Sequence, residues 1–313
     1  MNKRDAVLTV LDYSKPQEYI PAGFFLHFGG AYQTGAAAVD KHLEYFRATG
    51  MDFVKIQFEL KYPRFDWIRR PEDWERMPSF GGELFGPQLE VVERLVKAAK
   101  AEAVVFLTLY SPFMFACHLV DAQMVTAHMA ENPGAVNKGM QIITDSMMGF
   151  VQDCIRVGID GFYHSTQGYE SERFQDKSLF LECIKPYDLQ IMSEVNRQCP
   201  FNVLHVCDYH GGYDDLDPLL DYPGHVVNCN PHVGGRELSG VEISQLFGRP
   251  FMGGMDRKGV LATGGEEEIR AEARAVLSDA PDRFILAADC TVPGDTPWSN
   301  LSAAIDEAHR WKR

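Results

Sequence analysis

Short apolar runs alternate along the chain with longer stretches in which apolar residues recur at helical spacing. The apolar runs are rich in Val, Ile, Leu and Phe and are bounded by polar or turn-forming residues, which is typical of buried strands. The sequence therefore predicts eight strands, over residues 22–28, 52–57, 103–110, 161–165, 202–208, 226–230, 251–256 and 284–289.

The stretches between these runs predict helices. Residues 1–20 are expected to form a short amphipathic helix and a connector. Asn132 followed by Pro133 is typical of a helix start, because the asparagine caps the helix and proline needs no hydrogen bond in its first turn. The other helices are predicted over residues 39–48, 87–100, 119–129, 132–157, 178–198, 216–220, 243–247, 266–278 and 300–311.

Strands that alternate with helices indicate a parallel sheet with helical crossovers. Eight such units within 313 residues, with no break in composition, predict one (β/α)8 barrel domain over residues 1–313. The alternative is an open doubly wound sheet. Such a sheet usually carries a glycine-rich phosphate loop after its first strand, and Gly29-Gly30-Ala31 matches that loop poorly.

Composition narrows the function. Thirty basic residues against 44 acidic ones give a net charge of −14, which argues against nucleic acid and anionic membranes as partners. The N-terminus lacks a signal peptide, and no apolar window is long enough for a transmembrane helix. An odd number of cysteines, seven and widely spread, does not resemble a disulfide framework, so we expect a cytoplasmic protein.

Polar side chains follow nearly every predicted strand. In a barrel the carboxyl ends of the strands carry the active site, so we expect these side chains to converge there. We assign catalytic roles to Glu59, Tyr110, His164 and Asp256. We assign substrate binding to His27, Gln57, Asn228 and Asn230.

His205 and Cys207 stand two apart at the end of the fifth predicted strand, so their side chains point the same way. Cys290 follows the eighth predicted strand. One imidazole and two thiolates are typical of a catalytic zinc site that keeps its fourth position open. An H-x-C pair alone is also compatible with simple burial of the cysteine. Together with Cys290 it predicts Zn²⁺ bound by His205, Cys207 and Cys290.

Nearly the whole chain resembles the uroporphyrinogen decarboxylase superfamily, most strongly in its second half. The most specific match is the run from Ile285 to Leu301, which contains Ala-Asp-Cys-Thr-Val-Pro-Gly-Asp-Thr-Pro-Trp. The resemblance implies the same barrel, independently of the strand pattern. The other matching segments are residues 158–165, 185–187, 204–207 and 251–256.

One branch of this superfamily consists of metal-free decarboxylases of porphyrinogens. They hold substrate carboxylates with an arginine-rich stretch after the first strand and carry an aspartate at the end of the second. Here residues 24–32 contain no arginine, and the second strand ends in Gln57-Phe58-Glu59. The nearby arginines lie in the long loop 61–86. We therefore rank uroporphyrinogen decarboxylation second.

The other branch contains zinc methyltransferases, which move a methyl group from a corrinoid protein to a thiol such as coenzyme M. Their H-x-C motif and later cysteine match His205, Cys207 and Cys290. The similar barrel of cobalamin-independent methionine synthase adds a glutamate ligand that this chain lacks after its sixth predicted strand. For a fourth ligand Glu59, His164 and Glu170 therefore remain open.

A thiol is a nucleophile only as thiolate, and coordination to zinc deprotonates it. The sequence therefore favours a zinc-dependent methyltransferase with a small-molecule thiol as acceptor and a corrinoid protein carrying methylcobalamin as donor. A third hypothesis is a barrel in which Cys207 and Cys290 serve redox chemistry or metal storage. The identity of donor and acceptor stays open, as does the oligomeric state, for which a homodimer is one option.

Overall fold

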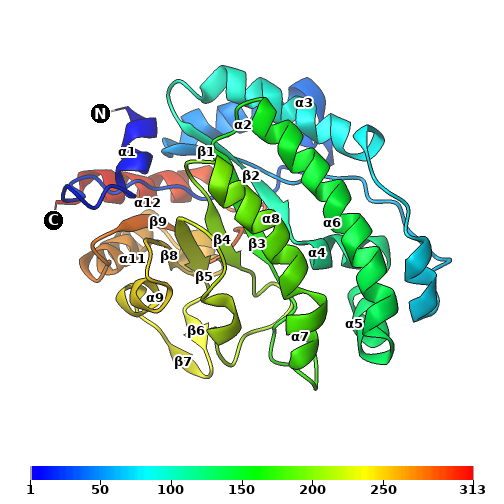
Figure 1. Cartoon of the computed structure of the whole chain (residues 1–313). Helices are drawn as coiled ribbons and strands as arrows, with labels where there is room; N and C mark the ends of the chain where they lie inside the picture. Colours follow the sequence, from blue (N-terminus) through cyan, green and yellow to red (C-terminus); the bar gives the residue numbers. More distant parts are fainter. Residues whose placement is uncertain (1, 313) are drawn as a thin grey trace.

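Seven parallel strands form one curved sheet at the centre of the protein, whose computed structural model describes residues 2–312 (Figure 1). The order of the strands across the sheet is their order along the chain, as the predicted alternation of strands and helices requires. The strands, in their order across the sheet, are β1 (Phe53–Ile56), β2 (Val104–Tyr110), β3 (Gly161–Thr166), β4 (Val203–Val206), β5 (Val226–Cys229), β8 (Phe251–Met255) and β9 (Phe284–Ala288).

Helices cover the outer face of this sheet (Figure 1). The last helix packs against α11 and also against α2, so the helical layer joins the end of the chain to its beginning. The helices are α1 (Lys3–Thr9), α2 (Gly35–Thr49), α3 (Gly82–Ala99), α4 (Pro112–Leu119), α5 (Ala122–Glu131), α6 (Pro133–Arg156), α7 (Ser178–Cys183), α8 (Lys185–Gln198), α9 (Gly240–Phe247), α10 (Val260–Thr263), α11 (Glu266–Ser278) and α12 (Trp298–Arg310).

The predicted first strand, residues 22–28, is not a strand in the structure. It makes one bridge, between Ala22 and Leu286 of β9. Its backbone nevertheless reaches both neighbours: Gly23 donates to the carbonyl of Leu286 at 3.0 Å, and the carbonyl of Ala22 accepts from Asp52 at 3.0 Å. Phe53 packs so closely that a Cβ on Gly23 would lie 2.5 Å from its ring. An α/β fold with a curved parallel sheet is confirmed, whereas a closed eight-stranded barrel is not.

Most predicted helices are present, with shifted ends. The helix expected over 178–198 is divided at Ile184, because α8 begins there with a proline in its first turn. The helix expected over 216–220 is a single 3-10 turn, Asp217–Leu219. The long loop 61–86 holds a 3-10 helix, Pro71–Arg76, and ends where α3 starts at Gly82. A hairpin of β6 (His232–Val233) and β7 (Arg236–Glu237) was not predicted.

Buried charges fasten the two ends of the chain to the sheet. Arg4 of α1 pairs with Asp160, which is almost completely buried just before β3. The carboxylate of Asp52 contacts His309 of α12 and accepts a hydrogen bond from Tyr19, each at 2.8 Å. The two termini therefore lie on the same side of the molecule (Figure 1). Within residues 2–312, no helix is long and apolar enough to cross a membrane.

Candidate metal centre

The carboxyl ends of β4 and β9 bring three metal-binding side chains together. Alternation along β4 turns His205 and Cys207, two residues later, to the inside of the sheet, and Cys290 is the second residue after β9. Their ligand atoms all lie within 4.8 Å of one another, and the Nε2 of His205 is 3.3 Å from the Sγ of Cys290. All three side chains are buried. The predicted trio is thus assembled.

Neighbouring groups hold these side chains in place. The ring of Tyr163 stacks on His205, with ring centroids 4.8 Å apart. Gln167 donates a hydrogen bond from its side-chain amide to the Sγ of Cys207 at 3.2 Å. The backbone of Cys207 donates to the carbonyl of Thr166, and its own carbonyl accepts from the hydroxyl of Tyr213. A cysteine with both backbone groups and its sulfur engaged has little freedom to turn away.

The two cysteines shift each other's pKa in opposite directions. The thiol of Cys290 hydrogen-bonds to Cys207 and, with help from His205, holds the pKa of Cys207 well below its usual range. The same hydrogen bond and burial raise the pKa of Cys290. A preformed thiolate beside a second thiol is the state from which a soft cation is readily bound.

Zinc fits this donor set. Zinc–sulfur and zinc–nitrogen bonds of about 2.3 and 2.0 Å put a nitrogen and a sulfur of a tetrahedral site roughly 3.5 Å apart. The 3.3 Å between the Nε2 of His205 and the Sγ of Cys290 is close to this separation. The buried Nδ1 of His205 has no hydrogen-bond partner among residues 2–312, so nothing there competes for the ring. One imidazole and two sulfurs are also ligands that zinc prefers.

None of the three candidates for a fourth protein ligand joins the trio; within the described chain, the cluster consists of His205, Cys207 and Cys290. Glu170 is buried and forms an ion pair with Arg173 at 3.0 Å. Glu59 contacts His27, as described below. His164 faces the other side of the sheet. The fourth coordination position would therefore be left to a substrate.

A cavity of about 450 Å³ opens above this cluster. Inward-facing side chains of β2 and β3, the N-terminal part of α4 and the segment after Cys290 form its walls. Six of the residues predicted for the site line it: His27, Gln57, Tyr110, His205, Cys207 and Cys290. Further lining residues include Thr108, Met114, His118, Tyr163, Ser165, Gln167, Tyr209, His210, Arg257 and Lys258.

The cavity wall also carries hydrogen-bonding groups from His27 and from Gln57, which follows β1. His27 lines the cavity, and its Nδ1 lies 2.7 Å from the carboxylate of Glu59, which also accepts from Gln33 at 3.2 Å. Gln57 is buried and donates to the carbonyl of Leu26 at 2.7 Å. Glu59 itself is not part of the lining, so it acts on the cavity through His27.

Besides Glu59, four predicted site residues do not line the cavity. His164 lies on the outer face of β3, because its neighbours Tyr163 and Ser165 face inward, and its Nε2 is 4.0 Å from Asp188 of α8. Asp256 is exposed and caps the turn at Lys258. Neither side chain therefore lies where the predicted catalytic role would require it.

The two asparagines of the sixth predicted strand have structural partners as well. Asn228 is completely buried; it accepts from the hydroxyl of Tyr163 and donates to two backbone carbonyls, at 2.7 and 3.0 Å. Asn230 donates to Asp208 at 2.7 Å and to Asp289 at 3.1 Å. Both amides are satisfied within the protein, so neither is free to bind a substrate.

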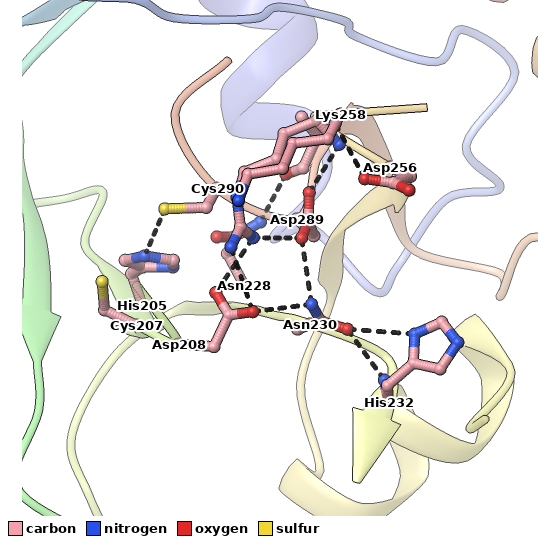
Figure 2. A network of polar contacts seen from close by, with 12 residues as sticks. His205, Cys207, Asp208, Asn228, Asn230, His232, Asp256, Lys258, Asp289 and Cys290 are labelled. Atoms are coloured by element: carbon pink, nitrogen blue, oxygen red, sulfur yellow. Dashed lines mark hydrogen bonds and ion pairs between the residues drawn. The ribbon is translucent and has the colours of Figure 1, made fainter. Parts of the chain in front are cut away.

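Sequence reasoning missed the network beside the cysteines. Arg257 lies between Asp208, the residue after Cys207, and Asp289, the residue before Cys290. Its guanidinium is 2.9 Å from Asp208 and contacts Asp289, and its backbone N–H donates to Asp289 at 2.8 Å. Figure 2 shows His205, Cys207 and Cys290 beside this network. The only signal in the sequence was that Asp208 directly follows Cys207 and Asp289 directly precedes Cys290.

A curved parallel sheet with a buried His-Cys-Cys cluster at the carboxyl ends of its strands defines an α/β protein with a candidate soft-metal centre. The sequence profile of uroporphyrinogen decarboxylase (URO-D) matches residues 43–311. The chain therefore belongs to the uroporphyrinogen decarboxylase family, which confirms the resemblance in its sequence. No curated protein sequence matches the chain.

Solved structures with the same fold include a methyltransferase from Methanosarcina mazei. It is 15% identical to this chain and has a TM-score of 0.78, and the match covers 98% of each chain. A B12-independent methionine synthase from Shewanella sp. W3-18-1, in complex with selenomethionine, is 12% identical with a TM-score of 0.59 over 93% of this chain and 97% of that one. At such identities these likenesses establish the fold.

Proposed function

We propose that the protein is a zinc-dependent methyltransferase that transfers a methyl group from a methylated corrinoid protein to a small-molecule thiol. The observation that carries this proposal is the convergence of His205, Cys207 and Cys290 at the base of a cavity, with no fourth protein ligand among residues 2–312. Family membership and the methyltransferase fold of a structural neighbour support it.

His205, Cys207 and Cys290 would hold the zinc, and bound zinc would keep an incoming thiol in its thiolate form. The protein side chains supply the positioning. Tyr163 and Gln167 fix the directions of His205 and Cys207. Thr108, Ser165 and Tyr110 line the cavity and offer hydroxyl groups that can orient a polar thiol.

The buried surroundings also favour a sulfur nucleophile. The cavity floor is enclosed by the sheet, so a thiolate there would have lost most of its hydration and gained fixed partners in exchange. The open mouth is where a methyl donor too large to enter would have to approach. A protein-bound corrinoid meets this requirement because only its methyl group has to reach the thiol.

The test combines metal analysis with methyl transfer. We expect about one zinc per chain in the wild type and clearly less in Cys290→Ala, as for a site with three protein ligands. Cys229→Ala is the matched control: Cys229 is equally buried, at the end of the neighbouring strand β5, but is not part of the cluster. Its zinc content should equal that of the wild type.

Methylcobalamin then replaces the corrinoid protein, and cobalamin absorbance reports its demethylation by a panel of small thiols. We expect demethylation with the zinc-loaded wild type and Cys229→Ala, and a large loss with Cys290→Ala. A wild type that stays metal-free after incubation with zinc refutes the proposal, as does a zinc-loaded enzyme inactive with every thiol. Free-thiol counting without reductant addresses redox use of the cysteines, since a Cys207–Cys290 disulfide would remove two thiols from the count.

A further inference from the structure

Lys55 is a lysine buried inside the sheet. It lies in the centre of β1, two residues before Gln57, and therefore one layer below the cavity that Gln57 lines. Its side chain is enclosed, and the residue as a whole is 5% exposed. Its ammonium group makes one hydrogen bond, to the side-chain carbonyl of Gln57 at 3.1 Å. It also faces the rings of Phe25 at 3.9 Å and Tyr163 at 4.5 Å.

This lysine has no carboxylate partner. Within the described residues 2–312, no aspartate or glutamate oxygen forms an ion pair with its Nζ. Burying a cation without an anion is costly, so the fold must either keep Lys55 neutral or supply negative charge nearby. Burial lowers the pKa of Lys55 to about 7, against opposing effects of Cys290, Glu59 and Cys207. The two metal-centre cysteines are thus among its nearest sources of negative charge.

One aromatic ring separates Lys55 from the metal centre. The face of Tyr163 contacts the ammonium group at 4.5 Å, and the same ring stacks on His205 at 4.8 Å. The hydroxyl of Tyr163 is itself engaged, because it donates to the side-chain carbonyl of Asn228. Between the lysine and the cluster there is accordingly packed protein, which screens charge far less than water does.

We propose that Lys55 balances the charge of the metal centre by taking up the proton that an incoming thiol loses. This inference rests on the function proposed above. Zinc cancels the charge of the two cysteine thiolates, so a bound substrate thiolate leaves the centre with one uncompensated negative charge. In the step, the S–H bond of the thiol breaks and an N–H bond forms on neutral Lys55. The resulting ammonium group stabilises the thiolate without any change in total charge.

The other titratable groups around Lys55 are not suited to this role. Burial lowers the pKa of His42 to about 4, so His42 is neutral near pH 7 and a poor proton acceptor. Burial raises the pKa of Tyr163 well above its usual value. Glu59 is held by His27 and Gln33 at the cavity rim. Among these neighbouring groups, Lys55 is therefore the one whose proton occupancy can change near neutral pH.

The test counts protons when a thiol binds to the zinc-loaded protein. Titration calorimetry with 2-mercaptoethanesulfonate, homocysteine and 2-mercaptoethanol, in buffers of different ionisation enthalpy, gives the number released. Near pH 7.5 to 8 we expect the wild type to release close to no protons, because Lys55 takes up the one that leaves the thiol. Lys55→Met should release about one, since thiols with a pKa near 8.5 arrive protonated.

The affinity for thiols should also depend on pH differently in the two proteins. Between pH 7 and 8.5 the dissociation constant of the wild type should be nearly independent of pH. That of Lys55→Met should fall about tenfold for each pH unit, as binding coupled to the release of one proton requires. Lys97→Met, which removes an exposed lysine of α3, is the matched control and should behave as the wild type.

If Lys55→Met does not fold, the number of protons released by the wild type alone tests the role of Lys55. Release of about one proton by the wild type near pH 7.5 to 8 overturns the role of Lys55 while leaving the proposed function intact, as does an unchanged proton count in a folded Lys55→Met protein. If no thiol binds to the zinc-loaded wild type, the proposed function fails and this inference fails with it.

Discussion

Arg257 and Asp208 form an ion pair at the edge of the metal centre, with the guanidinium 2.9 Å from the carboxylate oxygen. Asp208 directly follows Cys207, and the same guanidinium also contacts Asp289, which directly precedes Cys290. One buried arginine thus connects the two strand ends that carry Cys207 and Cys290. The distance between the cysteines is set by this connection as well as by the sheet.

The first prediction concerns this arginine. Arg257→Lys keeps a positive charge but cannot reach both carboxylates with a planar fork. We expect zinc affinity to fall by about tenfold to a hundredfold, which is typical when support around metal ligands is lost. Competition with a chromophoric chelator measures it. Arg249→Lys is the control, because Arg249 is half-buried and binds backbone carbonyls away from the site. Equal zinc affinities of Arg257→Lys and the wild type would contradict this role.

The sequence was sufficient to predict the convergence of His205, Cys207 and Cys290 because two simple rules apply to it. Alternation along a strand puts His205 and Cys207 on one face, and parallel strands bring their carboxyl ends to one edge of the sheet. Neither rule says which face of a strand is inside. Both faces of β3 are buried, so its pattern could not show that Tyr163 faces inward and His164 outward.

The remaining differences come from contacts between distant parts of the chain. Arg257 stands next to the predicted Asp256, but which of the two side chains faces the cavity depends on how the chain turns after β8. Residues 22–28 are apolar enough for a strand, yet within the described chain they form one bridge, between Ala22 and Leu286. Composition alone reveals neither effect.

The second prediction follows from the position of His164. Because this histidine faces away from the cavity, His164→Gln should keep zinc content and thiol binding at wild-type levels. Elemental analysis and calorimetry check this. Loss of either, in a protein that remains folded, would restore the catalytic role predicted from the sequence.

His164 should also affect the pH dependence of stability. Burial lowers its pKa to about 3, whereas an unfolded histidine titrates near 6.5. The contribution of neutral His164 to the free energy of unfolding is therefore present above pH 6.5 and is lost as the pH falls below that value. Between pH 6.5 and 5 the wild type should lose up to about 2 kcal/mol that His164→Gln does not lose. Urea unfolding measures this, with the exposed His232→Gln as control.

The third prediction concerns Asp188, which faces His164 from α8. Burial raises the pKa of Asp188 to about 7, against hydrogen bonds from Thr166 and Tyr222 that lower it. The folded protein then binds a proton that the unfolded chain releases near pH 4, so this contribution is full below pH 4 and is lost as the pH rises to 7. Its upper bound is on the order of 4 kcal/mol.

Asp188→Asn removes this dependence. The difference in unfolding free energy between the variant and the wild type should shift in favour of the variant from pH 5 to pH 8. Urea unfolding at both pH values measures this difference. The exposed Asp40→Asn on α2 should show no such difference. The direction is opposite to that of His164, so the two substitutions separate the members of this buried pair. A variant with the same pH profile as the wild type would show that Asp188 is ionised in the folded protein.

The fourth prediction is that uroporphyrinogen is not decarboxylated at an enzymatic rate. A porphyrinogen carries several carboxylates, each of which needs a cation or hydrogen-bond donors when buried. The arginines and lysines that line the cavity are Arg257 and Lys258, and Arg257 is already engaged by Asp208 and Asp289. The loop arginine Arg64 instead donates to the backbone carbonyl of His118. Chromatography of the porphyrins formed, with and without zinc, should therefore reveal no coproporphyrinogen above the level of a protein-free control. Its accumulation at rates that fall in Arg64→Ala would assign the loop arginines to substrate carboxylates and favour the decarboxylase over the methyltransferase.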